Sequence, residues 1–389
     1  MSAARACCTS IPQNYDSERH DNEYFARLTK KPALPRKAEN DQVEQTHMLI
    51  TAYFAAQQMI GAPNDDLLKN PKETHLANIR QLTFGGQNAE AYWNEAGTKL
   101  IYQSTQPDWP DEQILIMNAD GSNKRLISTG KGRCTCGYFL KGDRRVIYSS
   151  TDWADPGPAP KPDMSHGYVW MVNPNYHQFI QDLSTGERKM LDFGKGYAAE
   201  TTVAPNGKFL VFTSTRDGDL EIYRANLDGS NLKRLTREVG YDGGPFISWD
   251  GKKIVYRRDA LETEQERQDY ASLLAMNLVR PTKLEIWLMN ADGSGKRQIT
   301  HLGAASFAPF LLPDGKRIIF SSNYGDPKGR EFDLWMIGVD GKGLTRITFT
   351  PEFDGFPMIT RDGKKLVWAS NRNGRQPHET NIFVADWKE

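Results

Sequence analysis

The chain has 389 residues, with 49 Lys and Arg against 49 Asp and Glu, so its formal net charge at pH 7 is zero. A balanced charge argues against a nucleic-acid binder that works through a broad basic face. The 38% of hydrophobic residues, together with 33 glycines, is a globular proportion and excludes a disordered chain. No apolar run approaches the roughly 18 residues that a membrane-spanning helix needs, so we expect no transmembrane segment.

Cysteine usage and the first residues bear on metal binding and compartment. The four cysteines form an adjacent pair, Cys7 and Cys8, and a CxC pair, Cys134 and Cys136. Neither pair has the spacing of a zinc site, and four cysteines are too few for a disulfide scaffold. The N-terminal residues lack the apolar core of roughly 7 to 15 residues that a secretion signal carries, so no export signal is visible.

A turn related to x-[PDN]-G, followed by basic residues and a β run, occurs six times. The turns are residues 95–97, 141–143, 205–207, 249–251, 313–315 and 361–363, spaced by 46, 64, 44, 64 and 48 residues. An aromatic residue lies five positions after the end of each turn: Tyr102, Tyr148, Phe212, Tyr256, Phe320 and Trp368. Each run is short and rich in β-branched and aromatic residues, which favours a strand covered on both faces.

Each unit of about 45 residues contains four strands. A second β run follows the first, and in most units an Asp-Gly pair then favours a tight hairpin turn into a third run. With the segment before the first turn, this makes the four antiparallel strands of a propeller blade. The sixth unit ends without its outermost strand, and residues 79–84 can supply it from the other end of the chain. The sequence predicts an all-β fold, a six-bladed β-propeller over residues 76–389 closed by an N-terminal strand with no open sheet edge.

The repeats resemble the PD40 repeats of TolB-like β-propellers. The pattern R-L-T, P-D-G-K, a β run and I-Y-x-M-N-A-D-G-S is matched closely at residues 116–122, 214–223, 288–294, 369–374 and 381–387. The resemblance implies a six-bladed ring. Because TolB is a periplasmic envelope protein, it also implies a periplasmic or cell-envelope location. Such rings carry unrelated functions, so the resemblance is less specific for function than for fold. The residues before the ring do not resemble the separate α/β domain of TolB, so a direct Tol–Pal role is not implied.

Residues 1–75 are expected to form an arm of mainly helical and extended character before the ring. Residues 1–40 are polar, and we expect them to become ordered only against a partner or the flank of the ring. A rough apolar stripe predicts a helix over residues 41–61. The Asn-Pro pair at residues 70–71 resembles the start of a second helix.

Two repeats exceed the others by about twenty residues, and both additions fall between the second and third strands. This position puts them on the same face of the ring as the loops that join the blades. Residues 151–175 are rich in proline and aromatic residues, whereas residues 261–279 predict a helix. Long loops on one face are typical of a binding face, and equally of a cap over the channel. The candidate binding residues on this face are Trp153, Tyr168, Trp170 and Tyr270.

The mouth of the central channel should be lined by the segments that enter the first strand of each blade. The candidate binding residues there are Gln87, Asn88, Glu90, Glu200, Tyr241, Asp242, His301, Phe353 and Asp354. Carboxylates around a narrow opening could coordinate a hard cation such as Ca²⁺ or bind a cationic group. The alternative is that these side chains hydrogen-bond strand ends and channel water. Apart from Ca²⁺ in this mouth, we expect no cofactor.

The common catalytic motifs are absent. The sequence has no G-x-S-x-G elbow, no H-E-x-x-H pair, no P-loop and no G-x-G-x-x-G. We therefore assign no catalytic residue and expect a propeller that binds a protein partner, as an accessory or scaffold subunit of a cell-envelope assembly. The alternative is an enzyme of the polysaccharide lyase or hydrolase type that acts in the channel mouth. A third hypothesis, a carbohydrate-binding module, depends on the aromatic residues of the first long loop.

Overall fold

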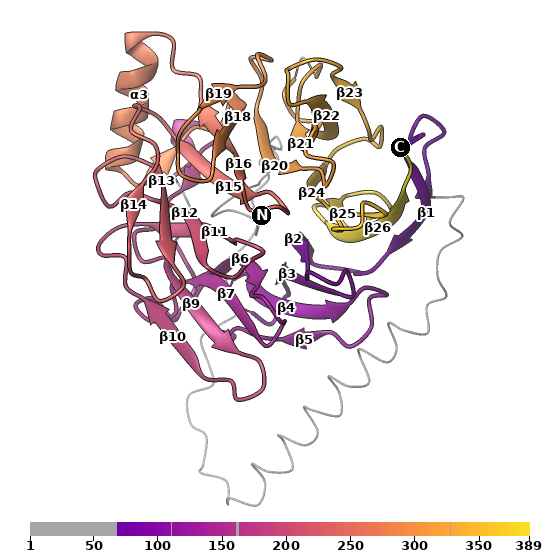
Figure 1. Cartoon of the computed structure of the whole chain (residues 1–389), viewed down its shortest axis with the longest axis horizontal. Coiled ribbons are helices and arrows are strands. Elements are labelled where there is room, and N and C mark those ends of the chain that lie inside the picture. The colour runs from indigo at the N-terminus through magenta and orange to yellow at the C-terminus, as the bar shows by residue number, and fades with distance from the viewer. Residues whose placement is uncertain (1–67, 110, 161–162, 327) are drawn as a thin grey trace, which may run out of the picture. The chain divides into compact units, whose positions relative to one another are not determined.

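The structure, a computed structural model, describes residues 68–109, 111–160, 163–326 and 328–389. Within these residues the chain folds into six four-stranded sheets that stand as blades around a central axis (Figure 1). The all-β, six-bladed propeller that the repeats predict is therefore confirmed. The helix expected over residues 41–61, and the rest of the arm before residue 68, lie outside the described residues.

The blades follow one another along the chain, and each begins with its inner strand. Blade 1 contains β2 (Gln87–Trp93), β3 (Lys99–Thr105), β4 (Gln113–Asn118) and β5 (Arg125–Leu126). Blade 2 contains β6 (Cys134–Phe139), β7 (Arg145–Ser150), β9 (His177–Asp182) and β10 (Arg188–Leu191). Blade 3 contains β11 (Ala198–Val203), β12 (Phe209–Ser214), β13 (Glu221–Asn226) and β14 (Lys233–Arg234).

The second half of the ring repeats this order. Blade 4 contains β15 (Asp242–Ile247), β16 (Lys253–Asp259), β18 (Leu284–Asn290) and β19 (Arg297–Gln298). Blade 5 contains β20 (Ser306–Leu311), β21 (Arg317–Ser322), β22 (Asp333–Gly338) and β23 (Thr345–Arg346). Blade 6 contains β24 (Asp354–Ile359), β25 (Lys365–Ser370), β26 (Asn381–Trp387) and, from the other end of the chain, β1 (Leu76–Gln81).

The core lies between neighbouring blades, which explains the unbroken apolar runs of the second strands. All six residues of β12 are buried, because both faces of the blade pack against neighbouring blades. The aromatic residues five positions after the six turns are all buried, at 2% exposure or less. Burying a side chain of this size contributes roughly 2 to 3 kcal/mol relative to leaving it in water.

The ring is closed by pairing between its first and last strands. β1 runs antiparallel to β26, with Leu76 opposite Trp387 and Gln81 opposite Phe383. In Figure 1 the indigo β1 lies beside the yellow β26. The closing strand predicted at residues 79–84 is therefore confirmed, with its bounds three residues earlier. Leu82 still donates its amide to Ile382 O at 2.8 Å, so the closing contact extends past the end of β1.

The second helix expected at residues 70–71 does not form. Asn70 Oδ1 accepts a hydrogen bond from the Lys72 amide, at 3.0 Å, but the chain turns instead of continuing as a helix. The Glu73 carboxylate is held by Arg372 of blade 6, and β1 begins at Leu76. These two constraints leave no length for a helix between Asn70 and the closing strand.

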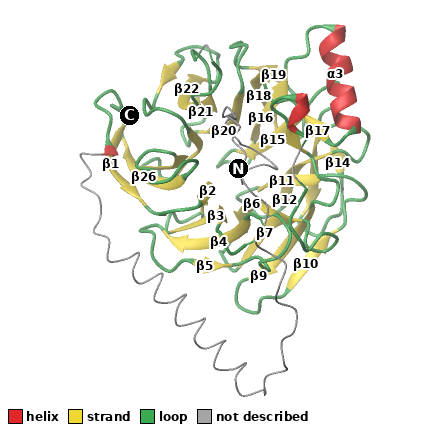
Figure 2. Cartoon of the chain, turned by 180° about the vertical axis from the view of Figure 1, so that it is seen from behind, coloured by secondary structure: helices red, strands yellow, loops and turns green. Residues whose placement is uncertain are grey.

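The second long loop contains the predicted helix in shortened form. α3 (Glu264–Ala275) starts with a capping box in which Thr263 and Glu266 bond each other's backbone amides. Leu278, near the end of the range expected to be helical, instead lies in β17 (Leu278–Val279), because that strand pairs with β8 (Trp170–Met171) of the first long loop. Figure 2 shows α3 in red at the edge of the ring.

Candidate functional site

The two long loops lie on one face of the ring and are joined to each other. They leave blades 2 and 4 after the second strand and return at the third, and β8 pairs with β17. Val169, Met171, Leu273 and Leu278 form a small buried cluster behind this two-stranded sheet. We call these two loops, residues 151–176 and 260–283, the lid. We call the face that carries them, together with the loops that join the blades, the loop face.

The lid places one large aromatic side chain at the inner end of blades 4 and 5. Trp170 is 4% exposed and packs edge-on against Tyr241 and Phe307, with ring centroids 6.5 and 6.0 Å apart. The guanidinium of Arg257 lies 5.5 Å from the Trp170 ring. Trp170 Nε1 donates to Tyr168 Oη at 2.9 Å, which fixes the orientation of the indole. The lid therefore reaches the inner strands of blades 4 and 5 at the loop face.

Each inner strand carries one residue in the left-handed region, where its pairing register shifts. These residues are Glu90, Cys136, Glu200, Gly244, Ala308 and Phe356, with φ between 48° and 59°. A bulge of this kind turns a side chain away from the regular alternation of the strand. Two of the six residues at this level are carboxylates, Glu90 and Glu200.

Glu200 is fully engaged by hydrogen bonds. Its carboxylate accepts from Tyr241 Oη at 2.5 Å and from the Gly244 amide at 2.7 Å. It also accepts from Thr213 Oγ1 at 2.6 Å and from Arg257 Nη2. Four donors on one buried carboxylate leave it no capacity for another ligand without breaking this network.

The glycine pair in Tyr241-Asp242-Gly243-Gly244-Pro245 makes room for this network. A Cβ at Gly244 would overlap the Arg257 guanidinium, and one at Gly243 would overlap the Tyr241 ring. Gly244 also has a backbone φ of +57°, a conformation that residues other than glycine adopt at an energetic cost. These glycines therefore allow Arg257 and Tyr241 to reach Glu200.

Glu90 differs from Glu200, because Oε1 of Glu90 has no hydrogen-bond partner among the described residues. The residue is 2% exposed, and burial raises its pKa from 4.5 to about 8, so it is protonated at neutral pH. It lines a chamber with about 40 Å³ of free volume, together with Cys136, Glu200, Arg257 and Thr201. That volume holds one or two water molecules.

The channel is also filled at the end opposite the lid. Tyr92 of blade 1 packs against Phe246 of blade 4, its diametrical counterpart, with ring centroids 5.6 Å apart. Tyr138 and Phe310 complete the cluster, each within 6 Å of the Phe246 ring. Aromatic rings therefore meet across the axis at this level. The chamber lies directly beside this cluster, because Tyr92 and Phe246 also line it.

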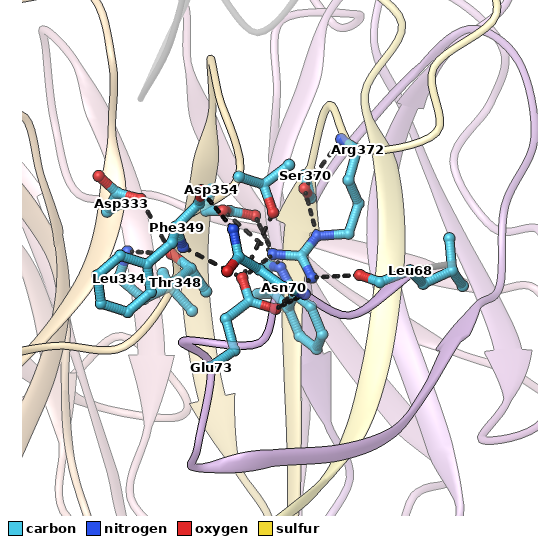
Figure 3. Close-up of polar contacts among 12 residues, drawn as sticks. Leu68, Asn70, Glu73, Asp333, Leu334, Thr348, Phe349, Asp354, Ser370 and Arg372 are labelled. Atoms are coloured by element: carbon cyan, nitrogen blue, oxygen red, sulfur yellow. Dashed lines mark hydrogen bonds and ion pairs between the residues drawn. The ribbon is translucent and has the colours of Figure 1, made fainter. Parts of the chain in front are cut away.

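Three of the residues expected at the channel mouth are buried where the blades meet. Asp354 is 0% exposed, and Arg372 Nη2 donates to both of its oxygens at 3.2 Å (Figure 3). Asp242 is also 0% exposed, 3.7 Å from Arg258 Nε, and burial raises its pKa. Phe353 packs with Phe332 and Phe356.

The other sequence-predicted residues are scattered. Asn88 donates to Gly85 O and Thr380 O, and Gln87 forms a bridge with Thr380 beside it, so both secure strand ends. His301 is exposed on a loop that joins two blades. Tyr270 of α3 is buried and donates to Asp219 Oδ1 at 2.5 Å. Trp153, in contrast, is 49% exposed.

The part of the chain that the structure describes offers no cluster of metal ligands. No group of three or more His, Cys, Asp or Glu side chains there is arranged to hold a metal ion. Asp354 in particular is engaged by Arg372 and does not join Glu90 and Glu200 in one cluster. Among the same residues, no helix combines the length and the hydropathy of a membrane-spanning segment.

Sequence reasoning missed Arg257 and the glycine pair. Arg257 lies within the short β run of blade 4, where it reads as an ordinary strand residue, and its partner Glu200 is 57 positions away. The available signal was the Gly-Gly pair directly after Tyr241-Asp242. Two adjacent glycines inside an expected strand indicate a bulge or a close approach by another group.

Comparison with known proteins agrees with this fold. Residues 157–265 match the PD40 family, the TolB beta propeller domain. A TolB homologue of Chlorobium luteolum is 28% identical over 145 residues, covering 31% of this chain and 33% of that protein. An uncharacterized protein of Agrobacterium fabrum is 25% identical over 200 residues, covering 41% of this chain and 68% of that protein. The chain therefore spans only about a third of the TolB homologue.

The solved structure of TolB from Acinetobacter baumannii aligns with 86% of this chain and 67% of that one, at 17% identity and a TM-score of 0.51. An identity this low is evidence for a shared fold and not for a shared function. The fold class is thus a six-bladed β-propeller closed by an N-terminal strand. This propeller is similar to the TolB proteins, and residues 157–265 carry the match to the PD40 family.

Proposed function

We propose that this chain is a non-catalytic propeller that binds another protein through its loop face. The observation that carries the proposal is the distribution of large exposed hydrophobic side chains. Of the six such residues in the described part of the chain, Trp153, Val239, Met276 and Tyr324 all lie in loops of this face. Exposed large apolar side chains are the residues that anchor a protein partner, so their bias toward this face favours it as the contact surface.

The state of the channel supports the same proposal. An enzyme that acts on a polysaccharide or a peptide needs a cleft of roughly 300 Å³ or more for its substrate. The chamber at Glu90 and Arg257 has about 40 Å³, and the aromatic side chains of Tyr92 and Phe246 line it. No observation on the described residues favours the lyase or hydrolase alternative over protein binding.

We further propose that the protein works in the periplasm or cell envelope, as an accessory or scaffold subunit of a larger complex. The support is the TolB-like fold and the PD40 repeats, which it shares with the TolB proteins above. A rigid ring whose long loops extend on one face suits a subunit that presents a contact surface.

The test compares variants at matched exposed positions. Tagged protein carrying Trp153→Ala and Tyr324→Ala is purified from the envelope fraction of its own organism, and the co-purified proteins are quantified. We expect the amount of at least one specific partner to fall tenfold or more, because each exposed aromatic anchor contributes about 1 to 2 kcal/mol to such a contact.

The control pair is Leu126→Ala and Met190→Ala. These residues have comparable exposure, 39% and 38%, but lie on the outer strands β5 and β10. The control should retain the partner. Loss of the partner in the control alone, or equal recovery in both variants, would overturn the proposal.

A further inference from the structure

The face opposite the lid carries an excess of positive charge. This hairpin face consists of the eleven turns that join first to second and third to fourth strands, each taken with one flanking residue on either side. These segments contain 19 Lys and Arg against 11 Asp and Glu. Because the whole chain has a net charge of zero, the rest of the chain carries the balancing negative charge. The zero total therefore hides an excess of positive charge on this face.

Eight of the eleven acidic side chains on the hairpin face accept hydrogen bonds from backbone amides of their own turns. Asp250, Asp314 and Asp362 each accept a hydrogen bond from the backbone amide two residues later, at 2.9, 2.7 and 3.1 Å. The aspartates of the third-to-fourth-strand turns do the same, as in Asp120 and Asp228. Carboxylates held in this way lie close to the backbone of the turn.

Many of the basic side chains on the same face form no side-chain hydrogen bond or ion pair with a described residue. Exposed basic residues without a side-chain hydrogen bond or ion pair to any described residue are Lys141, Arg145, Lys208, Arg297, Lys316 and Lys342. They come from blades 2 to 5, so they are distributed around the ring and not clustered at one point. Long flexible side chains reach further into solvent than capped aspartates. The outermost charge of this face is therefore positive.

The amino-acid composition of the hairpin face limits the class of partner that could bind there. None of the six large exposed hydrophobic residues in the described part of the chain lies in its turns. A protein partner needs buried apolar or aromatic anchors, and single-stranded nucleic acid needs aromatic side chains on which bases stack. A lipid leaflet with anionic headgroups needs neither, because basic residues near its surface are attracted by charge alone.

We propose that the hairpin face lies against a membrane leaflet that contains anionic lipids. In this orientation the loop face and its exposed Trp153 and Tyr324 point away from the membrane. The interaction is peripheral and purely electrostatic, so it weakens as salt screens it. It goes beyond the proposed function, because the loop face could bind a protein whether or not the opposite face meets lipid.

The test is co-sedimentation of the full chain with vesicles. One set contains phosphatidylcholine alone, and the other contains phosphatidylcholine with one quarter phosphatidylglycerol. We expect binding to the second set only, and its loss in about 1 M NaCl, where the Debye length falls to about 3 Å. The variant Lys141→Glu/Lys316→Glu should bind roughly thirtyfold more weakly or worse.

The matched control is Lys131→Glu/Lys328→Glu, which makes the same change in net charge at exposed positions on the loop face. It should keep most of the vesicle binding. The proposal is overturned if anionic vesicles do not sediment the protein at low salt, or if the control loses as much binding as the hairpin-face variant. It is also overturned if soluble dextran sulfate binds the chain at the hairpin face and the vesicles do not.

Discussion

Glu73 and Arg372 lie 299 positions apart in the sequence, yet Arg372 Nη2 donates to Glu73 Oε1 at 3.0 Å inside the protein. Arg372 also donates to Asp354, so one buried guanidinium joins the segment before β1 to blade 6 (Figure 3). Glu73 continues the contact to blade 5 through the Phe349 amide, at 3.1 Å. These buried ion pairs and hydrogen bonds supplement the strand pairing that closes the ring.

We predict that Arg372→Met destabilises the protein by about 3 to 5 kcal/mol, because it leaves the buried carboxylates of Glu73 and Asp354 without their cation. Urea unfolding of the full chain measures the change. The control is Arg361→Met, which removes an exposed ion pair with Glu95 and should cost less than about 1 kcal/mol. Equal effects of the two substitutions would show that the network does not hold the ring closed.

The position of Gly244 gives a second prediction. Gly244→Ala should destabilise the protein by about 3 kcal/mol or more, because the new Cβ meets the Arg257 guanidinium and the backbone stays left-handed. Gly251→Ala is the control, since Gly251 also has a positive φ, +72°, but has open space around it. It should cost about 1 to 2 kcal/mol. Urea midpoints that fall equally in both variants would contradict the role assigned to Arg257.

The buried carboxyl of Glu90 makes stability depend on pH. The unfolded chain loses this proton near pH 4.5, whereas the folded chain keeps it up to about pH 8. The unfolded state therefore binds fewer protons in that interval, and stability falls as the pH rises from 4.5 to 8. Asp259 and Asp333, whose pKa burial raises to about 7, act in the same direction.

Glu90→Gln should remove the Glu90 part of this dependence. We expect the variant to lose less stability than the wild type between pH 5 and pH 8.5, by an amount on the order of a few kcal/mol. Urea unfolding at the two pH values measures it. A wild type that becomes more stable as the pH rises, or a variant with an unchanged slope, would contradict the protonated state of Glu90.

The lid gives a prediction on chemical access to the chamber. In a chain with Cys7 and Cys8 replaced by Ser, Trp170→Ala should speed maleimide labelling of Cys136. This thiol lines the same chamber as Arg257, and Trp170 packs against the Arg257 guanidinium. Cys134 should stay slow, since burial raises its pKa to about 12. Trp153→Ala is the control and should leave labelling as slow as in the parent chain. Unchanged labelling in Trp170→Ala would mean that the lid does not seal the chamber.

Most of the fold could be predicted because the repeats encode it locally. Every blade carries its own turn and its own buried aromatic residue, such as Phe212 and Phe320, so six copies reinforce one interpretation. The closing strand could be inferred because one blade lacked its outer strand. The pairing of β8 with β17 could not, because strands of two residues have no periodic signature.

Less of the candidate site could be predicted from the sequence, because the site depends on contacts between blades. Asp354 stands at the start of a strand, where an open channel mouth was expected, but Arg372 turns it into part of the ring closure. Nothing local in the sequence pairs Arg257 with Glu200 across 57 positions. Trp153 and Trp170 look alike in one proline-rich loop, yet only Trp153 is exposed. Trp170 lies in β8, and the pairing of β8 with β17 of the second long loop places it in the core.

Protein binding through the loop face is tested most directly by site-specific photo-crosslinking. A photoreactive phenylalanine analogue is placed at Trp153 or Tyr324 on the loop face, and at Leu126 or Met190 on the outer strands, and cells are irradiated before the envelope is isolated. We predict that positions 153 and 324 give an adduct with the same protein and that positions 126 and 190 do not. Adducts with that protein at the outer-strand positions only, or none at either loop-face position, would contradict the account.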